Sequence, residues 1–159
     1  MDTKITKFYS PLRFPGGKHK YWRYFKEILN QDKNIDTFVE VFAGGAGLGL
    51  ALLSKNLINK LIINDLDPYI YALWYEILNN HKKLIKKIED TKPTVDEFKK
   101  RRNTYLSNPN GNELSMFIKA FTCLFVNRTT RSGIAKAGPI GGYKQEGDYP
   151  INCRWYQKI

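Results

Sequence analysis

A glycine-rich loop between an apolar run and a helix constrains this chain more than any other feature. Residues 38–49 read Phe-Val-Glu-Val-Phe-Ala-Gly-Gly-Ala-Gly-Leu-Gly, and an apolar stretch from Leu50 to Leu57 follows at helical spacing. A strand that stops at glycines and continues as a helix is typical of the first unit of a nucleotide-binding α/β fold. The glycines let the backbone turn sharply and approach a ligand. An ordinary α/β protein can also contain such a turn, because short glycine motifs recur by chance.

A second predicted strand supports the ligand-binding interpretation. It covers Lys60 to Asn64 and ends at Asp65, about 20 residues beyond the glycines, where an acidic side chain can hold ribose hydroxyls. The glycine spacing nevertheless fails the dinucleotide pattern, because Leu50 or Leu52 stands where the third glycine is needed. No Gly-Lys-Ser/Thr follows, so a phosphate-binding P-loop is also disfavoured. An NAD-dependent oxidoreductase is therefore a weak alternative.

The loop carries an acidic residue inside its strand, which favours a cofactor with positive charge. Its pattern is Glu40-x-Phe42-x-Gly44-x-x-Gly47. S-adenosylmethionine has a sulfonium, an ammonium and a ribose, so Glu40 and Asp65 would each have a group to bind. We therefore predict S-adenosylmethionine as the cofactor.

The charge of the chain favours a polyanionic partner. The formal net charge is +11 over 159 residues, and such a field attracts nucleic acid. A lysine-rich composition that decorates every surface is the alternative. Cys123 and Cys153 form no Cys-x-x-Cys pair, so no metal site is predicted, and two free thiols fit a cytoplasmic location.

Helices are predicted to surround and follow the two strands. Asp67 and Pro68 form an N-cap and first-turn pair, and Thr94 with Glu97 forms a capping box. A third β-α unit does not follow, so the predicted sheet is incomplete. The glycines after Arg128 predict a loop or hairpin region. The predicted helices cover His19–Leu29, Pro68 to about Asn80, His81–Asp90, a segment from Thr94, and Glu113 to about Asn127.

Four segments in one order resemble a known family. They are Arg13–Lys18 (Arg-Phe-Pro-Gly-Gly-Lys), Phe38–Gly47, Ile63–Pro68 and Asn127–Ile134. Together they resemble the Dam-like DNA adenine methyltransferases, over essentially the whole chain. The resemblance implies an α/β, Rossmann-like S-adenosylmethionine-dependent methyltransferase fold with a helical target-recognition insert. It also implies methyl transfer to the exocyclic amine of adenine in double-stranded DNA; a restriction-modification, phage or housekeeping setting stays open.

The resemblance assigns cofactor contacts. Phe14 falls where the family often has an aromatic such as Trp, and Lys18 closes the same loop. Core packing for Phe14, a solvated surface position for Lys18 and a turn-capping role for Asp65 are the alternatives. The predicted cofactor-binding residues are Phe14, Lys18, Glu40, Phe42, Gly44, Gly47 and Asp65.

The resemblance also assigns DNA contacts. Arg131 falls where the family places a residue that enters the base stack, Ser132 at a phosphate contact, and Lys136 at a base-reading position. The family often has an aromatic in place of Arg131 and Arg in place of Lys136. A non-specific phosphate-binding patch is an equal alternative for the basic residues. The predicted DNA-binding residues are Asn127, Arg128, Arg131, Ser132 and Lys136.

The catalytic motif of the family is missing. The family holds the adenine amine with Asp-Pro-Pro-Tyr or a relative, whereas none of the 7 prolines here are adjacent. We therefore predict no catalytic residue, and a chain that is the inactive front part of a longer enzyme. Residues 1–67 would be the N-terminal half of the cofactor domain and residues 68–159 the target-recognition region. The alternatives are a non-catalytic DNA-binding remnant, or half of a split enzyme whose second chain completes the sheet.

Overall fold

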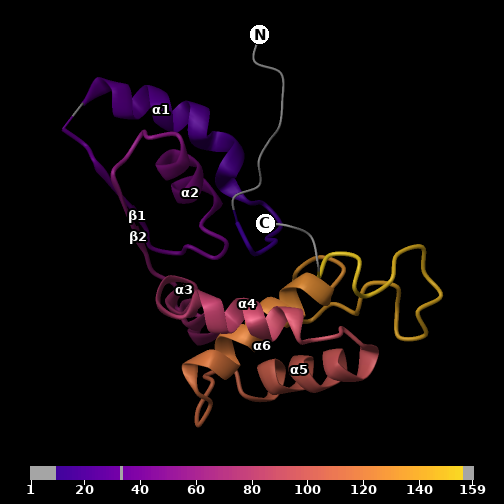
Figure 1. Ribbon diagram of the computed structural model, residues 1–159. Coiled ribbons are helices and arrows are strands. Elements are labelled where there is room, and N and C mark those ends of the chain that lie inside the picture. The colour runs from indigo at the N-terminus through magenta and orange to yellow at the C-terminus, as the bar shows by residue number, and fades with distance from the viewer. Residues whose placement is uncertain (1–9, 33, 156–159) are drawn as a thin grey trace. The chain divides into compact units, whose positions relative to one another are not determined.

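The chain folds into two compact units (Figure 1). The computed structural model describes residues 10–32 and 34–155. The first unit contains residues 10–11 and 16–64, and the second contains residues 12–15 and 65–155. Residues 1–9, 33 and 156–159 of the two predicted domains lie outside the described residues. No helix in the described part of the chain is long and apolar enough to cross a membrane.

The first unit contains a short parallel sheet. Strand β1 (Thr37–Glu40) pairs with β2 (Lys60–Ile63), with Thr37 opposite Lys60 and Glu40 opposite Ile63. A parallel pair requires a crossover connection, and helix α2 (Gly47–Ser54) provides it. Both predicted strands are confirmed. The arrangement is an α/β fold whose sheet has two strands among the described residues.

Helices cover one face of this sheet (Figure 1). The 3₁₀ turn η1 (Lys18–Tyr21) leads into α1 (Trp22–Gln31), so the helix predicted from His19 begins with a tighter turn. Because side chains alternate along a strand, Phe38 and Leu61 face the helices, whereas Val39 and Ile62 on the other face are 50% and 41% exposed. The core of this unit consists of Leu48, Leu52 and Ile58, packed against Trp22, Phe25, Leu29, Phe38, Leu57 and Leu61.

The second unit is a group of helices around α6. Helix α6 (Met116–Thr129) has every residue from 120 to 129 buried, and α3 and α5 pack along it. It begins three residues after the predicted start because Glu113 has a φ of +63°, which is incompatible with a right-handed helix. The other helices are α3 (Pro68–Asn79), α4 (His81–Glu89) and α5 (Val95–Ser107).

Local capping chemistry starts these helices. The Asp67 carboxylate accepts from the backbone N–H groups of Tyr69 and Ile70, with Pro68 in the first turn, as predicted. Thr94 Oγ1 accepts from the Glu97 N–H at 3.2 Å, so the cap of α5 is confirmed. The prediction that the Glu97 side chain completes a capping box with Thr94 is wrong for the described residues. Glu97 instead accepts from Arg101 Nε at 2.6 Å, because a charged donor lies one turn along the helix.

A turn-rich segment follows α6. Thr130 and Pro139 form an antiparallel bridge, and the Arg131 N–H donates to the Gly138 carbonyl at 3.2 Å. Gly141 and Gly142 have φ values of +79° and +76°, in the region that favours glycine. The predicted loop or hairpin region is therefore confirmed.

One buried hydroxyl in α6 predicts a stabilising substitution. Thr122 is fully buried, and its Oγ1 has no hydrogen-bond partner among the described residues. We expect Thr122→Val to raise the free energy of unfolding by about 1 kcal/mol, because it removes an unsatisfied polar group and keeps the shape. Thr129→Val is the matched control, because Thr129 Oγ1 donates to the Phe125 carbonyl at 2.6 Å. Urea denaturation of both variants measures this; equal effects would contradict the prediction.

Candidate functional site

The glycine loop of the first unit folds tightly after β1. The Ala43 N–H donates to the Asn64 carbonyl at 2.9 Å, and the Ala46 N–H donates to the Ala43 carbonyl at 2.6 Å. Gly44 and Ala46 both have φ values of +48°. Helix α2 begins at Gly47, three residues before the apolar stretch from Leu50. A Cβ added to Gly47 would lie 3.3 Å from the Cβ of His19. The absence of a side chain at Gly47 therefore permits η1 to pack against the loop.

Glu40 lies buried at the end of β1 and supports the start of α2. Its Oε2 accepts from the Gly49 N–H at 3.1 Å, which satisfies a donor that the first helical turn leaves open. Burial raises the pKa of Glu40, and the Gly49 hydrogen bond and the positive charge of Lys18 partly oppose that rise. The structure thus brings Lys18, Glu40 and Gly47 together in the first unit.

Two further residues have predicted cofactor roles: Phe42 within the loop and Asp65 after β2. The Phe42 side chain is 76% exposed. Asp65 Oδ1 accepts from the Asp67 N–H at 3.0 Å, so this side chain does cap the turn before α3. A contact with ribose stays a prediction.

A cavity of about 270 Å³ lies in the second unit. Phe14 lines it together with Asn127 and Lys136, so a predicted cofactor residue shares this cavity with two predicted DNA-binding residues. The Tyr105 hydroxyl donates to the Asp67 carboxylate beside it, and burial raises the pKa of Tyr105, with a further rise from Asp67.

The buried amide of Asn127 joins two loops of the second unit. Its Oδ1 accepts from the Arg13 N–H at 2.8 Å, and its Nδ2 donates to the carbonyls of Arg13 and Gly133, each at 2.9 Å. Gly133 has a φ of +79°, and a Cβ there would collide with the Arg13 carbonyl. The amide therefore fixes the segment 12–15 against the loop that follows α6.

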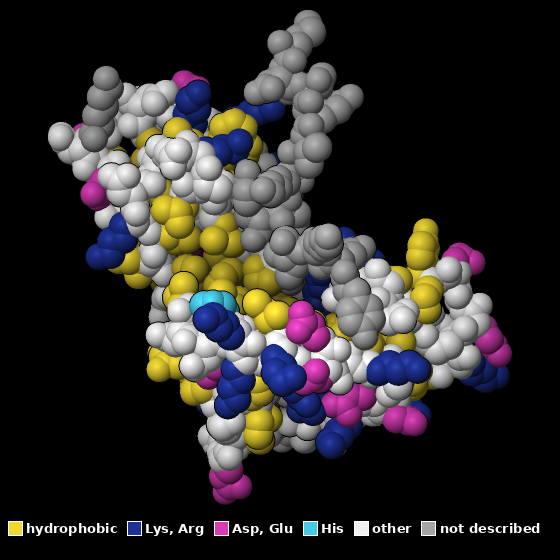
Figure 2. All heavy atoms as spheres, viewed as in Figure 1, with side chains coloured by type: hydrophobic (Ala, Val, Ile, Leu, Met, Phe, Trp, Pro, Cys, Tyr) yellow, Lys and Arg dark blue, Asp and Glu magenta, His cyan; other side chains and the backbone are white. Residues whose placement is uncertain are grey.

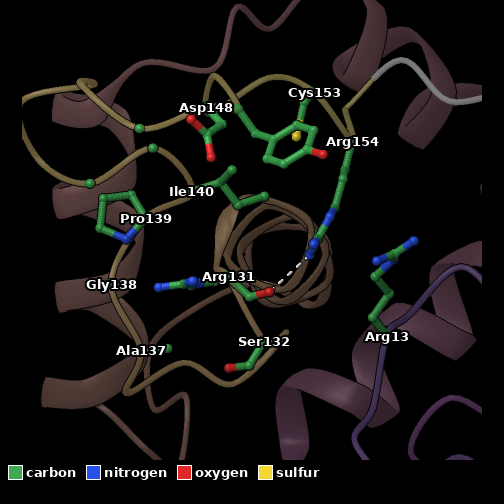
Figure 3. Close-up of a pocket in the computed structure, with 14 residues that line it drawn as sticks. Arg13, Arg131, Ser132, Ala137, Gly138, Pro139, Ile140, Asp148, Cys153 and Arg154 are labelled. Carbon is green, nitrogen blue, oxygen red and sulfur yellow. Dashed lines mark hydrogen bonds between the residues drawn. The ribbon is translucent and has the colours of Figure 1, made fainter.

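A larger cavity of about 950 Å³ is lined by this loop and the glycine-rich segment after it (Figure 3). Arg131 and Ser132, both predicted to contact DNA, line it and are exposed. Arg154 Nη1 donates to the carbonyls of Arg131 and Thr130, at 3.0 and 3.4 Å. In Figure 3 the Arg13 side chain lies near Arg154, whereas Arg131 points the other way.

Sequence reasoning missed Arg13 and Arg154 as candidate site residues. Arg13 opens the Arg13–Lys18 motif, so its position offers a signal, although the family resemblance assigns roles in this motif to Phe14 and Lys18 only. Arg154 had no such signal, because it reaches the cavity through contacts with residues 23 and 24 positions away.

On the face shown in Figure 2, Lys and Arg side chains are interspersed with acidic ones instead of forming one patch.

These features define an α/β protein with a glycine loop after its first strand and an arginine-lined cavity. Residues 14–152 match the D12 class N6 adenine-specific DNA methyltransferases, and the chain belongs to that family. The predicted family resemblance is confirmed.

Two curated relatives show how much of a longer protein this chain matches. The chain is 36% identical over 114 residues to the modification methylase StsI of Streptococcus sanguinis, covering 64% of this chain and 16% of that protein. It is 34% identical over 114 residues to the type II methyltransferase M.FokI of Planomicrobium okeanokoites, covering 60% of this chain and 15% of that protein. The chain therefore matches about one sixth of the length of these relatives.

The close approach of α2 to the sheet predicts that Gly49 cannot be replaced. A Cβ at Gly49 would collide with the Leu61 side chain and lie 2.9 Å from Glu40 Oε2. We expect Gly49→Ala to lower the free energy of unfolding by about 1–3 kcal/mol, as overpacking does. Gly138→Ala is the control, because the nearest atom to its Cβ is 4.0 Å away. Thermal unfolding of both variants measures the difference, and an unchanged Gly49→Ala protein would contradict it.

The raised pKa of Glu40 predicts that removing the charge of this side chain stabilises the folded protein, and that the gain depends on pH. An acid whose pKa is higher in the folded than in the unfolded state loses stability as pH rises through the interval between the two values. Burial raises the pKa of Glu40, so Glu40→Gln should be more stable than the wild type at pH 7, with a smaller difference at pH 4.

Urea denaturation at the two pH values measures this difference. The exposed Glu89→Gln change controls for the altered net charge. A Glu40→Gln gain that is the same at both pH values would contradict a titration effect.

Proposed function

We propose that this chain contributes part of an S-adenosylmethionine pocket and a DNA-reading surface to an enzyme that methylates the exocyclic amine of adenine. The observation that carries this proposal is the family match over residues 14–152. Residues 1–67 form the N-terminal half of a Rossmann-like cofactor domain, and residues 68–159 form the helical target-recognition insert. Enzymes of this class take their methyl group from the cofactor's sulfonium.

The cofactor proposal is supported by the chemistry of the loop after β1. Gly44 and Gly47 present no side chain at their positions in the loop, and the buried acid Glu40 lies within reach of the Lys18 charge. Glu40 suits the cationic part of the cofactor, and exposed Phe42 offers an apolar surface. Phe14 and Asp65 complete the proposed set, with Asp65 at the ribose.

The DNA proposal is supported by the cavities of the second unit. A target adenine must leave the base stack before its amine can be reached. Arg131 is proposed to enter the stack and Ser132 to contact a phosphate, since both are exposed on the large cavity. Lys136 can donate to guanine acceptors in the major groove. Asn127 and Arg128 are buried, so Asn127 is proposed to hold the loops in position.

We further propose that this chain alone does not transfer methyl groups. It has no Pro-Pro pair with which to hold the adenine amine, and alignment of the reacting atoms supplies much of the rate in such reactions. The exposed sheet face at Val39 and Ile62 offers a surface for additional structure. Residues outside this chain, in the same protein or in a second one, would supply the motif.

The test is transfer of labelled methyl from S-adenosylmethionine to duplex DNA. We expect no incorporation by the purified chain, and incorporation when a polypeptide that carries the acidic-Pro-Pro-aromatic motif is added. Robust incorporation by the chain alone would contradict the proposed inactivity. Cofactor binding that appears only with the added polypeptide would favour a split enzyme.

A non-catalytic DNA-binding protein is the second candidate. The arginine-lined cavity favours it, because that surface needs no cofactor to attract DNA. Sequence-specific DNA binding without S-adenosylmethionine, and no activity with any added polypeptide, would favour this alternative.

A further inference from the structure

The turn that leads into α3 is fixed by hydrogen bonds rather than by burial of its apolar side chain. It consists of Asp65, Leu66 and Asp67, and Leu66 is 88% exposed. The Asp67 N–H donates to Asp65 Oδ1 at 3.0 Å, so the position of the Asp65 carboxylate depends on the backbone of Asp67. Whatever fixes Asp67 therefore also fixes one oxygen of Asp65.

Both carboxylate oxygens of Asp67 accept hydrogen bonds. Oδ1 accepts from the N–H groups of Tyr69 and Ile70, at 2.8 and 3.4 Å, and so caps α3. Oδ2 accepts from the hydroxyl of Tyr105, which belongs to α5. Capping requires only the first oxygen, so the Tyr105 bond is an additional contact that the helix start does not need. It spans 38 positions and ties the turn to α5.

Tyr105 is a donor that its surroundings hold in place. Its ring packs against the ring of Tyr69, with 4.5 Å between the centroids. One turn earlier in α5, Arg102 donates through Nε and Nη2 to the carbonyls of Ala135 and Lys136, each at 3.0 Å, which anchors the helix. Burial raises the pKa of Tyr105, and the hydrogen bond to the carboxylate raises it further. The hydroxyl therefore stays protonated and keeps donating at neutral pH.

We propose that Tyr105 is a positioning residue for the cofactor: through Asp67, its hydroxyl holds the Asp65 carboxylate where that group meets the ribose. A carboxylate that is already oriented loses less conformational freedom when it binds. Because α5 lies in the proposed helical insert, the insert contributes to cofactor affinity through Asp67. Ribose as the ligand of Asp65 rests on the proposed function; the hydrogen bonds that link Tyr105 to Asp65 do not.

The first experiment measures amide hydrogen exchange of the ligand-free chain by NMR. We expect Tyr105→Phe to lower the protection of the Asp67 N–H by about tenfold, because the loss of one charge-assisted hydrogen bond lets the turn open more often. Tyr69→Phe is the matched control and should leave this protection unchanged. It removes a neighbouring buried hydroxyl that donates to the carbonyls of Thr104 and Asn108 instead of to the carboxylate.

The second experiment measures the affinity for S-adenosylmethionine by calorimetry, with the polypeptide that carries the acidic-Pro-Pro-aromatic motif present. We expect Tyr105→Phe to weaken binding by about tenfold, as the loss of one hydrogen bond to a charged group does, and Asp65→Ala to weaken it at least as much. The double variant should bind as weakly as Asp65→Ala alone, because effects that pass through one residue do not add. Tyr69→Phe should bind like the wild type.

The outcomes separate the positioning role from the proposed function. Unchanged protection of the Asp67 N–H in Tyr105→Phe would overturn the role, as would an equal fall in Tyr69→Phe. Additive losses of affinity in the double variant would overturn it as well, since Tyr105 would then act independently of Asp65. Affinity that needs Asp65 but not Tyr105 would overturn the role and leave the proposed function in place. A wild type that binds no S-adenosylmethionine would count against the proposed function and overturn the cofactor role with it.

Discussion

The hydrogen bonds of Asn127 are the constraint on which the second unit depends. One buried amide joins residue 13 to residue 133, and both cavities are lined by residues of the segments that it holds. Phe14 belongs to the smaller cavity and Arg13 to the larger one, so a single side chain fixes the walls of each. A buried amide with all its atoms bonded is also stable, because nothing remains unsatisfied.

One buried side chain, that of Glu40, also organises the first unit. The Glu40 carboxylate, placed by the end of β1, supports the first turn of α2 through Gly49, and Gly49 has no side chain that would push the helix away from β2. The acid that suits a cationic cofactor is thus also part of the scaffold of its own loop. Under the proposed function, cofactor binding and folding would compete for the Glu40 carboxylate.

Sequence reasoning predicted what short-range chemistry decides. The caps at Asp67 and Thr94 were predictable because donor and acceptor lie within three residues. The strands were predictable because the apolar run of the first ends at glycines and that of the second ends at Asn64 and Asp65. The start of α6 was misjudged because the left-handed backbone of Glu113 has no signature in that residue type. The Asn127 contact with Arg13 spans 114 positions, and Arg154 reaches the large cavity through residues 23 and 24 positions away, so neither contact could be predicted from local patterns.

The conformation and tight packing of Gly133 limit which positions of its loop can change in sequence. Its positive φ and its contact with the Arg13 carbonyl leave no room for another residue. Arg131, Ser132, Ile134 and Lys136 around it are exposed. Exposed loop positions tolerate substitution, so these residues can vary with little loss of stability while Gly133 keeps the loop in place. Positions 131 and 136, which are proposed to contact DNA, are therefore free to change while Gly133 keeps the shape of the loop.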